Sequence, residues 1–150
     1  MSINIDFLKY QDQLRVKKEE GKRYLFDPIR KLWLVLQPEE LVRQLVLQFL
    51  LQEKDYPRSH IKIEGGLKVN ELQKRTDILV FDREVKPFLL VECKAPQVKI
   101  DEKTFWQIAN YNSQYQAKYL LLTNGMLTYC CKMDYEQLQH DFLMEVPNYA

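Results

Sequence analysis

The chain has 150 residues, 46% of them hydrophobic, which predicts one domain with a substantial buried core. Charged residues make up 29% and nearly cancel to a net charge of +1, which excludes a histone-like coating protein but permits a local basic face. The three cysteines are an odd number without a Cys-x-x-Cys pair, so we expect no disulfide framework, no zinc site and a cytoplasmic location.

The N-terminal quarter of the chain is its most basic part and shows no signal peptide. Residues 1–22 are expected to be an extension, residues 23–135 the core of a single domain and residues 136–150 a tail. Leu32–Leu36 is an apolar segment of strand length. No apolar stretch reaches the roughly 18 residues that would span a membrane. The basic residues of this part are Arg15, Lys17, Lys18, Lys22, Arg23, Arg30 and Lys31.

A helix is expected to begin at Pro38, since proline and the two glutamates that follow it suit the first turn of a helix. Apolar residues then recur at helical spacing, and Pro57 ends the helix near Lys54. Three strand candidates follow, at 61–68, 76–81 and 88–94. A hairpin connection over 82–87 joins the second and third, whose nearly continuous apolar runs are typical of central strands.

After the third strand, Asp101 can cap a second helix over about 102–117. Tyr119–Thr123 is a fourth buried strand, Asn124-Gly125 favours a hairpin turn, and residues 126–133 form a fifth strand, a candidate edge strand that carries Cys130 and Cys131. The strand–helix–strand order predicts a parallel pair with a right-handed crossover. The fold class is therefore α/β: a mixed sheet (helix, three-strand meander, helix, strand, strand) with flanking helices.

Two charged residues interrupt the apolar third strand. Glu92 and Lys94 are two positions apart and should share one face of the sheet, with Cys93 on the other. Charges inside an apolar strand are costly unless they are paired or used. A plain salt bridge at a strand end is the alternative to a functional pair.

Asp77 favours the functional reading. If the hairpin is symmetric about Glu84 and Val85, Asp77 lies directly opposite Glu92, although a bulge would shift this register by one residue. Facing carboxylates repel each other unless a cation lies between them. Carboxylate oxygens are the ligands that Mg²⁺ or Mn²⁺ prefers. Beside such an ion, the ammonium of Lys94 can orient an attacking water and balance charge during phosphodiester hydrolysis.

Two helices could complete the site. Glu40 lies on the first, with Arg43 one turn further on, and a simple Glu40–Arg43 pair is the alternative there. Gln107 and Tyr111 share a face of the second helix, where a structural face is the alternative to one that contacts substrate.

The sequence at this point resembles the PD-(D/E)xK nuclease signature, with Asp77 followed by Glu92-x-Lys94 and with Thr76 in place of the usual proline. On its own this pattern is degenerate. The surrounding residues, over about 23–135, resemble the N-terminal nuclease domain of type I restriction enzyme restriction subunits. They are Pro38-Glu39-Glu40-x-Val42-Arg43-Gln44, Arg75-Thr76-Asp77-Ile78, Leu90-Val91-Glu92-Cys93-Lys94-Ala95-Pro96, Gln107-x-x-x-Tyr111-Asn112 and Leu122-Thr123-Asn124-Gly125.

The resemblance implies a restriction-endonuclease-like fold and a metal-dependent endonuclease acting on DNA. It implies that Mg²⁺ or Mn²⁺ is held by Asp77, Glu92 and the backbone carbonyl of Cys93, and that Lys94 lies at the attacking water. It implies that Glu40 and Gln107 are further members of the catalytic set. The residues that it places at the substrate are Arg43, Arg75 and Tyr111.

The expected partners are DNA and other subunits of a restriction system; a homodimer is left open and no membrane is expected. No helicase P-loop is present in these residues. Two alternatives remain: a non-catalytic nucleic-acid-binding or interaction module on the same fold, and an enzyme acting on RNA, whose phosphodiester is the same. If the basic N-terminal segment lies along DNA, neutralising Lys17, Lys18, Lys22 and Arg23 should weaken binding.

Overall fold

The computed structural model describes residues 2–63 and 78–149, apart from the side chains of residues 111, 112 and 114. Arg75 and Asp77, and most of the strand expected over 61–68, lie outside the described residues. Within the described part, no helix is long and apolar enough to cross a membrane.

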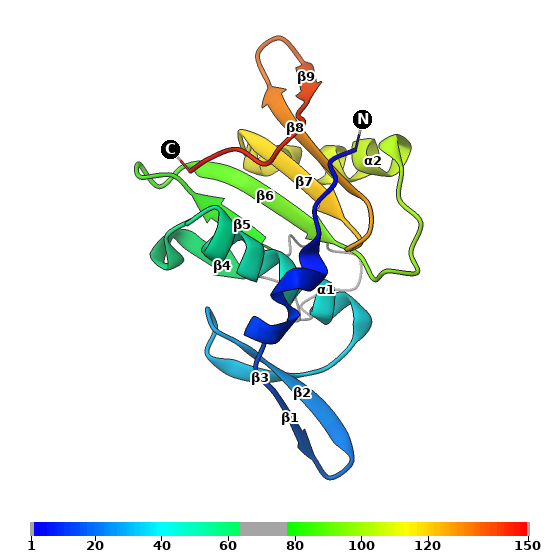
Figure 1. The fold of residues 1–150 in the computed structure, drawn as a ribbon. Coiled ribbons are helices and arrows are strands. Elements are labelled where there is room, and N and C mark those ends of the chain that lie inside the picture. Colours follow the sequence, from blue (N-terminus) through cyan, green and yellow to red (C-terminus); the bar gives the residue numbers. More distant parts are fainter. Residues whose placement is uncertain (1, 64–77, 150) are drawn as a thin grey trace.

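A six-stranded mixed sheet is the centre of the molecule, with its strands in chain order across the sheet (Figure 1). Neighbouring strands are antiparallel except β6 and β7, which are parallel. The predicted meander, hairpin and parallel pair are thus confirmed in the described residues. The strands are β4 (Ile61–Ile63), β5 (Ile78–Phe81), β6 (Pro87–Cys93), β7 (Tyr119–Thr123), β8 (Thr128–Asp134) and β9 (Gln139–Phe142).

Helices cover both faces of this sheet, which is why its central strands are apolar on both sides. Helix α1 (Pro38–Gln48) begins at the predicted proline and continues as a π-helical turn, η2 (Phe49–Glu53). It packs on the face that carries Val91 and Cys93. Helix α2 (Glu102–Asn112) is followed by a 3-10 turn, η4 (Ser113–Tyr115), and its face of the sheet carries Leu90 and Leu122.

The N-terminal residues form a second, three-stranded antiparallel sheet, of which the sequence analysis predicted only the strand at Leu32–Leu36. It consists of β1 (Val16–Glu19), β2 (Lys22–Asp27) and β3 (Leu32–Val35), and it projects from the domain beyond α1 and the 3-10 helix η1 (Phe7–Gln13) (Figure 1). The β1–β2 turn places Glu20 and Gly21 at positive φ, 49° and 80°. Only glycine adopts this geometry without strain, and this single glycine was the overlooked signal.

The C-terminal residues add structure that the sequence analysis did not expect. Strand β9 pairs with β8, so Cys130 and Cys131 lie on an interior strand and the prediction of an edge strand there is wrong. Val146 is buried in the α1-side cluster. The hydroxyl of Tyr149 donates to the carbonyl of Phe81 at 2.8 Å, which ties the C-terminal segment to β5.

Candidate functional site at the ends of β6 and β7

The register of the β5–β6 hairpin decides which residue could face Glu92. Ile78 pairs with Val91 and Leu79 with Leu90, which is the register predicted from the sequence. The hairpin itself is not symmetric, because the register shifts by one between Val80 and Phe81. The bulge lies between the turn and these pairs, so it does not alter the pairing beyond them. Asp77 lies outside the described residues, and its position opposite Glu92 stays a prediction.

Glu92 and Lys94 lie together where β6 ends. The Lys94 Nζ is 3.4 Å from the Glu92 Oε2, and the two side chains are 30% and 14% exposed. Cys93, between them, is completely buried on the α1 side. The prediction that Glu92 and Lys94 share one face is therefore confirmed. That face is the α2 side, because Glu92 pairs with Leu122 in the adjacent strand.

The backbone around Lys94 is held by the last residue of β7 and by the loop that follows it. The Lys94 N–H donates to the Thr123 carbonyl at 2.9 Å, which extends the parallel ladder by one bond. The Asn124 Nδ2 donates to the Val98 carbonyl at 2.9 Å. Asn124 thus fixes the segment after Lys94, a role that its place in an Asn-Gly pair did not reveal. That pair begins a four-residue connection between Thr123 and Thr128, longer than a tight hairpin turn.

Gly125 brings α1 to the same end of the sheet. Its φ is +90°, and a Cβ added there would lie 3.3 Å from the Val42 Cγ2. Glycine is therefore required both by the backbone conformation and by the close approach of α1. The contact places Val42, two residues after Glu40, beside the connection between β7 and β8.

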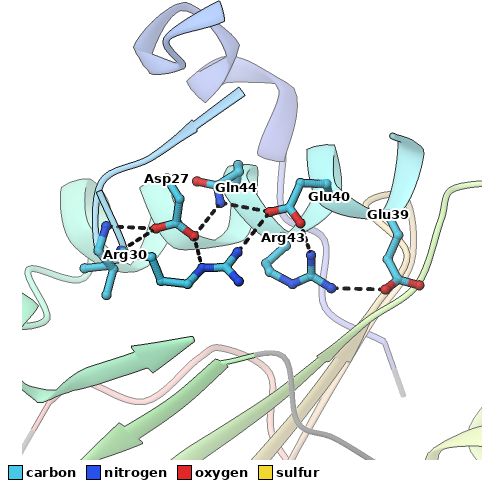
Figure 2. Close-up of polar contacts among 7 residues, drawn as sticks. Asp27, Arg30, Glu39, Glu40, Arg43 and Gln44 are labelled. Carbon is cyan, nitrogen blue, oxygen red and sulfur yellow. Dashed lines mark hydrogen bonds and ion pairs between the residues drawn. The ribbon is translucent and has the colours of Figure 1, made fainter. Parts of the chain in front are cut away.

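A buried polar cluster joins α1 to the small sheet (Figure 2). Glu40 accepts a short hydrogen bond from Arg43 and a second bond from the Gln44 Nε2 at 3.0 Å. The Arg30 guanidinium lies 3.7 Å from the same carboxylate. Arg43 also bonds Glu39 at 3.0 Å, and its side chain is only 4% exposed. The Glu40–Arg43 pair, the alternative weighed from the sequence, is present.

Asp27 is the other centre of this cluster and was not a candidate in the sequence analysis. It is fully buried. Its Oδ1 accepts from the backbone N–H groups of Ile29 and Arg30 at 2.8 and 2.9 Å. Its Oδ2 accepts from the Arg30 Nε at 2.8 Å and from the Gln44 Nε2 at 3.1 Å. The amide of Gln44 therefore bridges Asp27 and Glu40. A polar Gln44 in an apolar helix was the signal in the sequence.

The α2 candidates are less closely tied to this site. Asp101 caps the helix as predicted, accepting from the Thr104 N–H at 2.8 Å, and these hydrogen bonds lower the pKa of its carboxyl. Gln107 is exposed on α2. The side chain of Tyr111 and all of Arg75 lie outside the described residues. The structure thus brings together Glu92 with Lys94, and Glu40 with Arg43, but the roles of these residues stay predictions.

Of the donors expected for a divalent cation, the Glu92 carboxylate and the Cys93 backbone carbonyl lie within the described residues. Among residues 2–63 and 78–149 no three His, Cys, Asp or Glu side chains gather in a way that could hold a metal ion. Glu92 offers a hard oxygen donor with some exposure. A carboxylate of this kind suits Mg²⁺ or Mn²⁺, and a second would have to come from Asp77.

The chain is similar to a known protein family and to a solved structure. A fragment described as an HsdR subunit of a type I restriction enzyme from Vibrio vulnificus YJ016 is 23% identical, with a TM-score of 0.37; the match covers 59% of this chain and 17% of that chain. No curated protein sequence matches. The family model "Type I restriction enzyme R protein N terminus (HSDR_N)" matches residues 38–147, well over half of the chain. The chain therefore belongs to this family of type I restriction enzyme R protein N-terminal domains.

Proposed function

We propose that this chain is a metal-dependent endonuclease that hydrolyses DNA phosphodiester bonds at the ends of β6 and β7. The proposal includes a cytoplasmic location. It also includes association with other subunits of a restriction system, because the family is one of restriction enzyme R proteins. The single observation that carries it is the Glu92–Lys94 pair, an acid and an ammonium 3.4 Å apart at the end of a central strand. Membership in the family of type I restriction enzyme R protein N-terminal domains supports the same chemistry.

Each residue of the pair has a definite task in this proposal. Glu92 binds the cation through a carboxylate oxygen, with Asp77 and the Cys93 carbonyl as the further ligands. The cation supplies charge neutralisation at the phosphate and a water of lowered pKa. Lys94 orients the attacking water and balances the negative charge that develops on the phosphoryl oxygens. The Lys94 N–H bond to Thr123 keeps the backbone of this lysine in place.

The outer parts of the site are proposed to support these steps. Glu40, in the first turn of α1, is assigned to the catalytic set, and its bonds to Arg43 and Gln44 fix its direction. Gln107 is assigned to the catalytic set, and Arg43, Arg75 and Tyr111 are assigned to the substrate. Arg43 would act through its effect on Glu39 and Glu40, since its side chain is buried between them.

The test is cleavage of supercoiled plasmid by the wild-type chain with Mg²⁺, with Mn²⁺ and with EDTA. Wild type should nick DNA with either metal and not with EDTA. Lys94→Ala should abolish cleavage yet bind DNA almost as well, because affinity comes from many phosphate contacts while Lys94 acts in the transition state. Lys132→Ala, which removes another lysine, from β8, is the matched control and should cleave like wild type.

Metal binding has its own readout. Mg²⁺ that binds the folded state alone should raise the melting temperature, increasingly so with concentration, and the shift should disappear in Asp77→Asn. An equal shift in both proteins would place the cation elsewhere. If Lys94→Ala loses binding together with cleavage, or if wild type binds without cleaving, the non-catalytic binding module is the better description. The same cleavage assay with an RNA of matched sequence would show whether the substrate is DNA or RNA.

A further inference from the structure

The small sheet formed by β1, β2 and β3 has two chemically different faces. Successive residues of a strand point to opposite sides. In β2, Leu25 and Asp27 are buried and belong to the side that meets α1 through the Asp27–Gln44 bond. Tyr24 and Phe26 point to the other side, where Phe26 pairs with Trp33 of β3. The cations and rings of this second side, called here the basic–aromatic face, are Arg15, Lys17, Lys22, Tyr24, Phe26 and Trp33. Glu19 and Val35 lie on the same side.

Cations and rings alternate on the basic–aromatic face. The Arg15 Cζ lies 4.4 Å from the centre of the Phe26 ring and 5.4 Å from that of Trp33. The Lys17 Nζ lies 4.6 Å from the Trp33 ring and 5.8 Å from the Tyr24 ring. All three rings are only half-buried. Neither buried cluster of the described residues includes them. The face therefore offers partly open rings with cations held beside them.

The charge of this region is opposite in sign to the rest of the chain. Residues 14–36 contain seven Lys and Arg against three Asp and Glu, a net charge of +4. Because the whole chain carries +1, all other residues together carry −3. One acid lies on the face itself, since Glu19 pairs with Lys17 at 2.8 Å. A separated positive region of this kind attracts a polyanion such as nucleic acid.

The small sheet is also firmly attached and lies outside the part of the chain that the family model covers. The matched segment starts at residue 38, after β3. Asp27 joins the end of β2 to the middle of α1 through Gln44 at 3.1 Å. The sheet projects beyond α1 (Figure 1), so its outer face can be reached by a long ligand.

We propose that the basic–aromatic face binds an unpaired stretch of nucleic acid. Bases stack on Trp33 and Tyr24, and the phosphates between them are neutralised by Arg15, Lys17 and Lys22. Rings on a basic surface suit unpaired bases because a duplex hides the faces of its bases, whereas a single strand presents them. This binding goes beyond the proposed hydrolysis, since it requires neither a metal nor a reaction.

The first arm of the test uses intrinsic fluorescence of the full chain in EDTA, titrated with a 12-nucleotide thymidine oligomer. The chain has two tryptophans, Trp33 on this face and Trp106 on α2. Stacking should quench Trp33, so the quench is expected in wild type and in Trp106→Phe and should be lost in Trp33→Phe. A quench that remains in Trp33→Phe, or no quench with intact protein, overturns the proposal.

The second arm compares two pairs of cations on opposite faces of the same strands. Lys17→Ala with Lys22→Ala removes two charges from the basic–aromatic face. Lys18→Ala with Arg23→Ala removes two from the other face and is the matched control. Binding measured by fluorescence anisotropy should weaken markedly more for the first pair, and Trp33→Ala should weaken it about tenfold.

Three outcomes would contradict the proposal: equal losses for the two pairs, which indicate general attraction alone; equal affinity for a duplex of the same length; and no oligonucleotide binding at all. Circular dichroism and melting of each variant establish folding, and Trp33→Phe keeps the test valid if Trp33→Ala does not fold. Lys94→Ala should retain the quench. If the wild-type chain does not cleave DNA but the oligomer quenches Trp33, only the proposed nuclease activity is refuted. If the wild-type chain cleaves DNA but the oligomer does not quench Trp33, only the proposal for the basic–aromatic face is refuted.

Discussion

The most informative single perturbation of this fold is Asp27→Asn. The substitution keeps one oxygen for the backbone N–H groups of Ile29 and Arg30, replaces the other oxygen by an amide nitrogen and removes the negative charge. That position now receives the Arg30 Nε at 2.8 Å and the Gln44 Nε2 at 3.1 Å, both of them donors. The variant therefore leaves donors facing each other in a fully buried site and leaves Arg30 without its closest counter-charge.

The expected cost follows from burial. Removing one partner of a buried ion pair costs about 3–5 kcal/mol, and the Arg30 side chain, 14% exposed, can recover some hydration. We therefore expect about 3 kcal/mol, which for a chain of this length lowers the melting temperature by roughly 6–12 °C. Glu19→Gln is the matched control, because it makes the same change of charge in an exposed ion pair and should cost less than about 0.5 kcal/mol.

The assay is urea unfolding followed by circular dichroism, with the free energy obtained by linear extrapolation. A double-mutant cycle with Gln44→Met should show a coupling above about 0.5 kcal/mol, since the two side chains are directly bonded. A loss below about 1 kcal/mol for Asp27→Asn, or no coupling with Gln44, would refute the view that this cluster holds the small sheet on α1.

Three further predictions concern the supports of the site. Gly125→Ala should lower the free energy of unfolding by about 1–2 kcal/mol because of its positive φ. The loss should exceed that of Gly21→Ala, which also has a positive φ but no neighbour within 4 Å, and equal melting temperatures of the two variants would contradict the close approach to α1. Burial raises the pKa of the Cys131 thiol to about 12 and that of Cys130 further, so neither should react with a thiol reagent at pH 8 until urea unfolds the chain; rapid labelling of folded protein would count against it. Asp101→Ala should lower the melting temperature at pH 7. Because the pKa of the Asp101 carboxyl is lowered in the fold, the difference in melting temperature between variant and wild type should shrink as the pH falls through that lowered pKa. A difference that does not change with pH would show that the charge of Asp101 plays no part.

Much of the α/β core was predictable because its signals are local. Pro38 and the glutamates after it specify where α1 begins. Asp101 specifies where α2 begins. Alternation within a strand was enough to place Glu92 and Lys94 on one face, since a side chain cannot change face without a bulge. Even the register of the β5–β6 hairpin followed from symmetry, although a bulge near its turn showed that the symmetry itself was only approximate.

The N-terminal sheet was harder to predict because its strands are short, half-exposed and highly charged, and such sequences resemble an extension. Asp27 shows the difficulty most clearly. In the sequence it is one acid in a basic segment, yet in the fold it is completely buried between Arg30 and Gln44. Its partner on α1 is 17 residues away, and no periodicity within either element indicates that the two will meet.

The sequence by itself determined the elements from α1 to β8, their order and the acid–lysine pair of β6, because helix caps, strand alternation and turns act over a few residues. The tertiary structure decided what those residues meet. It placed α1 against Gly125 at the end of the sheet, buried Glu40 among Arg30, Arg43 and Gln44, and gathered the cations and rings of the small sheet on one side. These contacts depend on how separate elements pack around a shared core, and packing is a property of the whole chain.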